Sequence, residues 1–175
     1  MKHSNEGSLP EGGTLPWTHS CFVCGQDNPR GLRLKSRLED GTVYMDYTPR
    51  REDLGYSNLI HGGITMALMD EVMTWAAIIR AQAPCVAAVF NCRLRRPVTV
   101  GMPITVEGRV QKSKARLVLT HGIVRKKDDS SVLATANGKY VPMKADDLRA
   151  VSKDFVEHPS AIALSRILPH GNGDH

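Results

Sequence analysis

The most prominent pattern in the sequence is one long apolar segment, HGGITMALMDEVMTWAAIIR, which runs from His61 to Arg80. It is too long for an ordinary strand and contains no Gly or Pro after its opening glycines, so it predicts an α-helix. Its apolar residues leave almost no polar face, which indicates a helix buried inside the protein. We expect this helix to end near Arg80, before Pro84.

Two carboxylates interrupt the apolar segment at its middle. The segment is about as long as a membrane span, but Asp70 and Glu71 would be costly in lipid, so we expect no membrane span. Adjacent helical residues point about 100° apart, so the two acids cannot share one role. We favour an ion pair with one of the arginines for Glu71 and a catalytic role for Asp70, because a buried carboxylate without a partner is costly.

Alternating apolar and polar positions predict β-structure on both sides of the helix. Leu32, Leu34 and Leu38 form one alternating face, and Val43, Met45 and Tyr47 form another. Asp40-Gly41 between them is a hairpin signal. After the helix we expect strands at 86–95, 104–112, 117–126 and 132–143, of which the last three form an antiparallel meander. Two short helices are predicted near 148–155 and 161–168.

One apolar helix and about six antiparallel strands predict an α+β fold in which a strongly curved sheet wraps around the helix. We expect a disordered tail over residues 1–20, one domain over 21–145, and short helices with a tail over 146–175. The edge strands of such a sheet need cover. We therefore expect at least a homodimer, with one sheet continuing across both subunits.

Composition narrows the function classes. The chain has 175 residues and a net charge of +5, without a long basic run or interleaved aromatics, so we expect no nucleic-acid partner. Residues 1–20 lack a signal-peptide pattern, and we expect the four cysteines to be free, which together favour the cytoplasm. For Cys21-x-x-Cys24 we expect two buried or half-buried thiols, because a second ligand pair for zinc and a redox-type context are both missing.

Three stretches are similar to a known family: HGGITMALMDE, NCRLRRPVTVGMPITVEGRV and CFVCGQDNPRGLRL. Together with the order hairpin, helix and four-strand meander, they resemble the hotdog-fold acyl-CoA thioesterases of the phenylacetate-degradation type, in the 4-hydroxybenzoyl-CoA thioesterase-like superfamily. The resemblance covers roughly residues 21–143. It implies hydrolysis of an acyl-CoA thioester to a carboxylic acid and coenzyme A, no cofactor or metal, and a homodimer or homotetramer.

The same resemblance assigns roles to residues of the long helix. Asp70 stands in the place of the catalytic carboxylate, acting as general base on water or as nucleophile. Gly62 stands where a backbone N–H polarises the thioester carbonyl, with Gly63 beside it among the substrate-binding residues. Thr74 stands where some relatives carry a hydroxyl that helps to hold water. His61 is expected to orient the loop.

Two positions depart from the family pattern. Relatives often carry Asn or Gln where this chain has Gly55, and Ser or Thr where it has Ala87. Both missing groups would assist water or carbonyl positioning. This leaves open an alternative in which the domain binds acyl-CoA without hydrolysing it.

Spacing along the helix makes a further prediction. Gly62 and Asp70 are eight residues apart, which is about 12 Å of helical rise. One carbonyl cannot reach both at hydrogen-bond distance, so an active site that uses both needs two chains. Among the basic residues around the strand ends, we expect Arg96 and Arg116 to contact the phosphates of coenzyme A.

Overall fold

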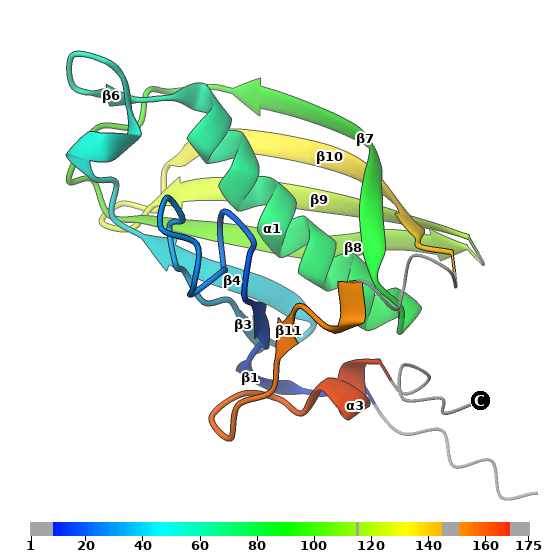
Figure 1. Cartoon of the computed structure of the whole chain (residues 1–175). Helices are drawn as coiled ribbons and strands as arrows, with labels where there is room; N and C mark the ends of the chain where they lie inside the picture. Colours follow the sequence, from blue (N-terminus) through cyan, green and yellow to red (C-terminus); the bar gives the residue numbers. More distant parts are fainter. Residues whose placement is uncertain (1–8, 115, 145–150, 169–175) are drawn as a thin grey trace, which may run out of the picture.

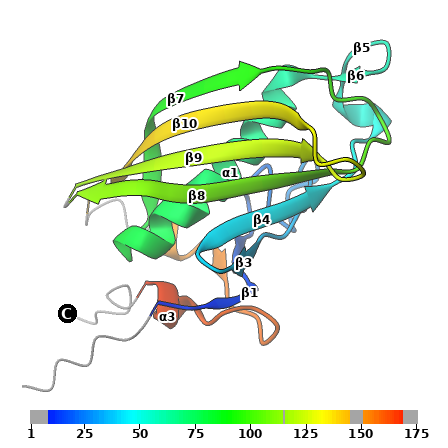
Figure 2. The ribbon, with the colours of Figure 1, turned by 180° about the vertical axis from the view of Figure 1, so that it is seen from behind.

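A curved antiparallel sheet wraps around one long helix in the computed structural model, which describes residues 9–114, 116–144 and 151–168 (Figures 1 and 2). The strand order is β1-β3-β4-β8-β9-β10-β7. These strands are β1 Gly12–Thr14, β3 Arg37–Glu39, β4 Thr42–Tyr47, β7 Cys85–Leu94, β8 Ile104–Lys114, β9 Leu117–Lys126 and β10 Val132–Pro142. The predicted α+β architecture is confirmed.

The helix α1 spans Gly62–Ala81, close to its predicted bounds. Its residues Leu68, Met69, Val72 and Met73 are fully buried, and burial of such side chains stabilises the fold by about 1.5–3 kcal/mol each. By length and composition alone α1 is apolar enough to cross a membrane. In this structure it instead lies on the concave face of the sheet (Figure 1).

Two strand glycines let α1 approach the sheet closely. Gly108 of β8 and Gly122 of β9 are register partners. A Cβ at Gly108 would lie 2.6 Å from the backbone of Val72, and one at Gly122 would lie 2.6 Å from the Met73 sulfur. Glycine within a strand is typical where another backbone comes this near. The close approach sets the depth at which α1 sits in the sheet.

The predicted hairpin is confirmed, since β3 and β4 pair across Asp40 and Gly41, which both have positive φ. The meander β8-β9-β10 is also confirmed, but the four-strand meander is wrong. Strand β7 pairs with β10 at the edge of the sheet rather than with β8. The connection over residues 95–103 is long enough to carry the chain from one side of the meander to the other, so sequence order did not fix this neighbour.

The predicted disordered tail over residues 1–20 is wrong for residues 9–20. Strand β1 pairs with β3, and β2 (Trp17–Thr18) pairs with β11 (Phe155–Val156). Leu15 and Trp17 are buried, so two apolar anchors hold a segment that is otherwise polar and rich in Gly and Pro. Residues 1–8 lie outside the described part of the chain.

The C-terminal segment differs in part from its prediction. Of the helix expected near 148–155, residues 148–150 lie outside the described residues, Val151 and Ser152 are helical, and Phe155–Val156 is strand β11. The helix expected near 161–168 is observed as the shorter α3, Leu164–Ile167. Because Ile167 is fully buried, this segment is part of the domain.

Candidate active site

The start of α1 is fixed by a histidine cap. His61 precedes the first helical residue, and its Nδ1 accepts a hydrogen bond from the Gly63 N–H at 2.9 Å. In the described part of the chain the Gly62 N–H has no hydrogen-bond partner. The first N–H groups of a helix lie at the positive end of its dipole. Gly62 therefore presents a free donor, whereas the N–H of Gly63 is already engaged by His61.

Asp53 fixes the loop that precedes the capping residue His61. Sequence reasoning missed this role. Asp53 ends the short 3₁₀-helix η1 (Arg51–Asp53), which is followed by the small hairpin of β5 (Leu54–Tyr56) and β6 (Leu59–Ile60). Its buried carboxylate accepts hydrogen bonds from the Tyr47 hydroxyl and from the Arg50 N–H at 2.8 Å. Its carbonyl accepts the His61 N–H at 2.7 Å. The loop and the helix cap are thus one connected unit.

The structure explains one of the two departures from the family pattern. A Cβ at Gly55 would lie 3.0 Å from the Cα of His61, so a larger side chain would have to move the capping residue. Ala87 lies on β7 and is exposed in the single chain. Neither position supplies a polar side chain.

Asp70 lies two turns further along α1 and is held by a tyrosine of the sheet. Its Oδ1 accepts a hydrogen bond from the Tyr140 hydroxyl at 2.6 Å. Tyr140 is fully buried on β10, and burial together with this bond to Asp70 raises the pKa of the hydroxyl, so it remains a donor at neutral pH. Thr74, one turn after Asp70, is partly buried.

Tyr140 is a site residue that sequence reasoning missed. The available signal was its position on a buried face of an alternating strand, because a buried tyrosine hydroxyl needs a partner. Asp70 was already the prominent buried acceptor. Only the fold shows that the two residues face each other across the space between α1 and β10.

The helix start borders a cleft of about 250 Å³. Its lining residues are Leu59, Ile60, Gly62, Thr65, Leu94, Arg95, Arg96, Pro97 and Val98. The cleft therefore brings together the predicted Gly62 and Arg96. Asp70 does not line it, since eight residues of continuous helix separate it from Gly62 by about 12 Å. Within one chain the two halves of the predicted site stay apart.

Arg116 lies at the other end of the sheet. It precedes β9 in the turn after β8, and β9 starts beside the end of β10 at Tyr140. Arg96 follows β7, where its N–H donates to the Leu133 carbonyl at the start of β10. The ten residues of β9 span about 33 Å. One chain therefore cannot place Arg96 and Arg116 on the same small ligand.

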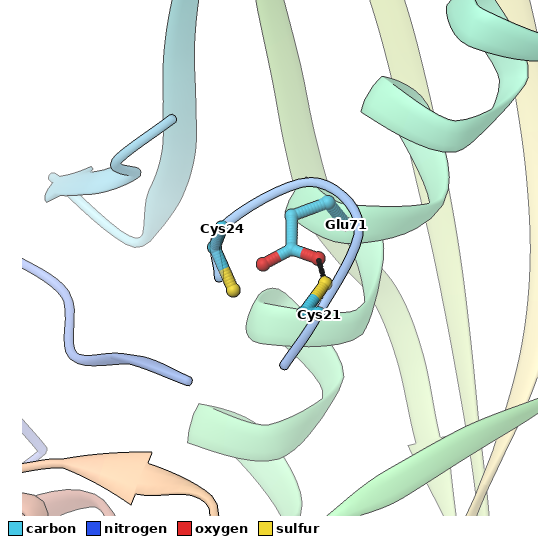
Figure 3. A group of neighbouring side chains, drawn as sticks. All are labelled: Cys21, Cys24 and Glu71. Atoms are coloured by element: carbon cyan, nitrogen blue, oxygen red, sulfur yellow. Dashed lines mark hydrogen bonds between the residues drawn. The ribbon is translucent and has the colours of Figure 1, made fainter. Parts of the chain in front are cut away.

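Glu71 faces away from this site, toward two cysteines. Its Oε1 accepts from the Trp75 indole N–H at 3.0 Å, and its Oε2 accepts from the Cys21 thiol at 3.4 Å (Figure 3). The predicted ion pair with an arginine is wrong among the described residues. Burial, followed by the nearby Cys21 charge, raises the pKa of Glu71 to about 8. The hydrogen bond from Cys24 lowers the pKa of the Cys21 thiol.

Comparison with known proteins shows which family and structures the chain is similar to. Residues 57–133 match the sequence model of the thioesterase superfamily. The chain has the hotdog fold, and this segment is similar to that superfamily. The matched segment begins before the helix cap and ends at the start of β10, so it contains His61, Gly62, Asp70 and Arg96 but not Tyr140. No curated protein matches the sequence.

Solved structures show the same fold. A thioesterase superfamily protein is 25% identical with a TM-score of 0.62, over 71% of this chain and 60% of its own length. An acyl-CoA hydrolase from Staphylococcus aureus, in complex with butyryl coenzyme A, coenzyme A and coenzyme A disulfide, is 19% identical with a TM-score of 0.57, over 61% and 65%. PaaI, from the phenylacetic acid degradation operon of E. coli, is 18% identical with a TM-score of 0.55, over 61% and 75%.

These likenesses confirm the predicted hotdog fold and support the predicted resemblance to the thioesterase superfamily. The chain spans about 60% of the length of the first of these structures. The two relatives below 20% identity show the fold alone.

Proposed function

We propose that this hotdog domain hydrolyses acyl-CoA thioesters to a carboxylic acid and coenzyme A. The main support is the position of Asp70. Its carboxylate is partly buried in the middle of an apolar helix and accepts a hydrogen bond from the Tyr140 hydroxyl at 2.6 Å. Burying a carboxylate in an apolar helix costs free energy. In a domain similar to the thioesterase superfamily, its presence favours a role as general base. The coenzyme A bound by the Staphylococcus aureus hydrolase supports the choice of substrate class.

The reaction follows from two groups. Asp70 takes a proton from a water molecule whose oxygen attacks the thioester carbonyl carbon. The Gly62 N–H, at the positive end of α1, stabilises the negative charge that develops on the carbonyl oxygen. The C–S bond then breaks, and coenzyme A leaves as a thiol once its sulfur has taken a proton. Thr74 lies one turn from Asp70 and is proposed to help hold the water.

Each site is proposed to use two protomers, with Gly62 from one and Asp70 from the other. The roughly 12 Å between them along one helix requires this if both act on one carbonyl. Strand β7 supports the pairing, because it is a ten-residue edge strand. Its exposed large apolar side chains are Val86, Val89 and Leu94, at 46%, 39% and 46% exposure. An exposed apolar edge strand of this kind can pair with the same strand of a second protomer.

Arg96 is proposed to bind coenzyme A phosphate at the helix-start cleft, which it lines together with Gly62. Arg116 lies at the far end of the same sheet, so its proposed phosphate contact requires the other protomer or a different site. We also propose that the dimers associate into a dimer of dimers and that the protein is cytoplasmic.

A second candidate function is acyl-CoA binding without hydrolysis. It is favoured by Gly55, which the neighbouring His61 backbone keeps small, and by Ala87, because neither supplies the polar group that often assists catalysis in relatives. In this reading Asp70 serves only as the partner of Tyr140.

The two functions separate in one experiment. Wild type and Asp70→Asn are incubated with aliphatic and aryl acyl-CoAs, and free coenzyme A is measured by chromatography. A thiol reagent is unsuitable, because Cys21, Cys24, Cys85 and Cys92 are free. Hydrolysis requires coenzyme A release by the wild type and a fall in kcat of at least about 100-fold in the variant. Tight binding of the same acyl-CoAs without release in either protein would instead establish the binding function.

A further inference from the structure

A compact loop over residues 18–34 lies against the outer side of α1 and carries the Cys21-x-x-Cys24-Gly25 motif (Figure 3). We call it the cysteine loop. The Val23 N–H donates to the Cys21 sulfur at 3.3 Å, and the Gly25 N–H donates to the Cys21 carbonyl at 2.9 Å. A Cβ at Gly25 would lie 2.3 Å from that carbonyl oxygen. The tight turn thus needs glycine at position 25 and directs the Val23 N–H at the Cys21 sulfur.

Three potential metal ligands converge where this loop meets the helix. The sulfurs of Cys21 and Cys24 and a carboxylate oxygen of Glu71 all lie within 4.8 Å of one another. Cys21 and Glu71 are 50 residues apart in sequence and come from separate elements. The cluster is distinct from the proposed active site, since Glu71 points to the cysteine loop whereas Asp70 points to Tyr140.

The geometry of the cluster is that of a site ready for a small cation. In a tetrahedral zinc site, Zn–S of about 2.3 Å and Zn–O of about 2.1 Å place sulfur and oxygen about 3.6 Å apart. The Cys21 sulfur and the Glu71 Oε2 are 3.4 Å apart. The Trp75 N–H occupies the other oxygen, Oε1. An outer partner of this kind orients a ligating carboxylate, and it leaves Oε2 directed at the cysteines.

We propose that Cys21, Cys24 and Glu71 bind a zinc ion that joins the cysteine loop to helix α1. Two thiolates and one carboxylate are ligands that zinc prefers, and water supplies the fourth ligand because Cys21 and Glu71 are partly exposed. The Cys21-x-x-Cys24 pair by itself predicted only ordinary thiols, since no further ligand was evident in the sequence. The fold supplies the third ligand, Glu71.

The observations favour a metal over a disulfide switch between the two cysteines. A disulfide would direct the sulfurs toward each other and leave the Glu71 carboxylate with only the Trp75 indole as partner. A cation instead uses all three groups and compensates the negative charge that they carry when deprotonated. The two readings differ in whether Glu71 matters, which makes Glu71 the decisive residue to change.

The test uses the full chain, reduced, loaded with zinc and freed of excess metal by gel filtration. Zinc content is measured by mass spectrometry of the metal, and affinity by competition with a chromophoric chelator. We expect one zinc per chain in the wild type, almost none in Cys21→Ser or Cys24→Ser, and affinity weakened at least about tenfold in Glu71→Gln. Cys92→Ser, a cysteine of β7 outside the cluster, is the matched control and should keep its zinc.

Cobalt provides a readout that requires no variant. Cobalt-loaded wild type should show thiolate-to-cobalt charge transfer and the visible absorption of a tetrahedral site, and zinc should displace both. Zinc should also raise the melting temperature of the wild type but not of Cys24→Ser. Three results would overturn the proposal: a wild type that binds no zinc, a Glu71→Gln variant that binds it as tightly as wild type, or a Cys21–Cys24 disulfide that forms despite saturating zinc.

Discussion

The Asp70 carboxylate accepts a hydrogen bond from the Tyr140 hydroxyl at 2.6 Å, across 70 residues of sequence and between α1 and β10. This bond fixes the direction of the proposed catalytic base, and Tyr140 acts on the reaction only through Asp70. It is therefore a positioning residue.

Removing the Tyr140 hydroxyl tests this positioning. In Tyr140→Phe we expect kcat to fall at least about tenfold while KM changes less than about twofold, because a hydrogen bond to a charged group contributes about 1.5–3 kcal/mol. Steady-state kinetics with one good acyl-CoA substrate measure both constants. Tyr56→Phe is the control, since Tyr56 is 82% exposed. An unchanged or higher kcat in Tyr140→Phe would mean that Tyr140 only fills the core.

Mixing two inactive variants tests whether each site needs two chains. Asp70→Asn removes the base, and Gly62→Pro removes the N–H donor at the first helical position, where proline is well tolerated. Each homodimer should be nearly inactive. After subunit exchange, half of the dimers are mixed and each has one intact site of two, so the mixture should recover up to about a quarter of wild-type activity.

Two controls accompany the mixing experiment. Circular dichroism and light scattering must show that Gly62→Pro folds and assembles, because a Cβ at this position would lie 2.9 Å from the Leu94 side chain. Subunit exchange must be followed with tagged chains. If exchange is complete and activity stays at the level of the separate variants, the site lies within one chain.

Strand β7 is expected to hold the dimer together. Val89→Lys places a charge on the exposed apolar edge and should convert the dimer to a monomer, with loss of activity, because charged edge strands resist pairing. Light scattering after gel filtration measures the mass. Gln111→Lys, an exposed position on the interior strand β8, should remain dimeric. A dimeric Val89→Lys variant would place the interface elsewhere.

The two arginines are expected to affect binding more than chemistry. Arg96→Ala and Arg116→Ala should raise KM for acyl-CoA more than they lower kcat, because they contact a remote part of the substrate. The same changes should matter little for an acyl-pantetheine, which lacks the nucleotide. Since Arg116 lies at the opposite end of the sheet, the two variants can be judged separately. Equal effects on both substrates would mark the arginine concerned as structural.

Asp53 is expected to stabilise the loop before α1 in a pH-dependent way. Burial alone would raise its pKa, but hydrogen bonds from Tyr47 and Arg50 outweigh it, and the pKa lies below its usual value. The stabilisation is therefore present above the unfolded pKa of about 3.9 and is lost as pH falls through the lower folded pKa. Asp53→Asn should lower stability by about 1–3 kcal/mol at pH 7.

Chemical denaturation at several pH values measures this effect. The stability difference between wild type and Asp53→Asn should shrink as pH falls below about 4, where the carboxylate becomes protonated in the unfolded chain. Asp128→Asn, whose side chain is 65% exposed, should have little effect at any pH. A difference that stays constant with pH would show that the Asp53 charge is not involved.

The sequence by itself determined the elements and the chemistry carried on α1. The apolar run from His61 to Arg80 predicted a long buried helix, because its pattern leaves almost no polar face. The HGG start and Asp70 lie within 10 consecutive residues, so their spacing along α1 follows from helical rise alone. The hairpin at Asp40-Gly41 was also predictable from the sequence, because both turn residues tolerate positive φ.

The tertiary structure decided which distant groups meet. Tyr140 reaches Asp70 because β10 lies under α1, Glu71 meets Cys21 rather than an arginine because residues 18–34 cover that side of the helix, and β7 lies beside β10 rather than β8. Local patterns record only which face of an element is apolar. Long-range pairings depend on how loops and chain ends close over the core, and for this no residue spacing in the sequence provides a signal.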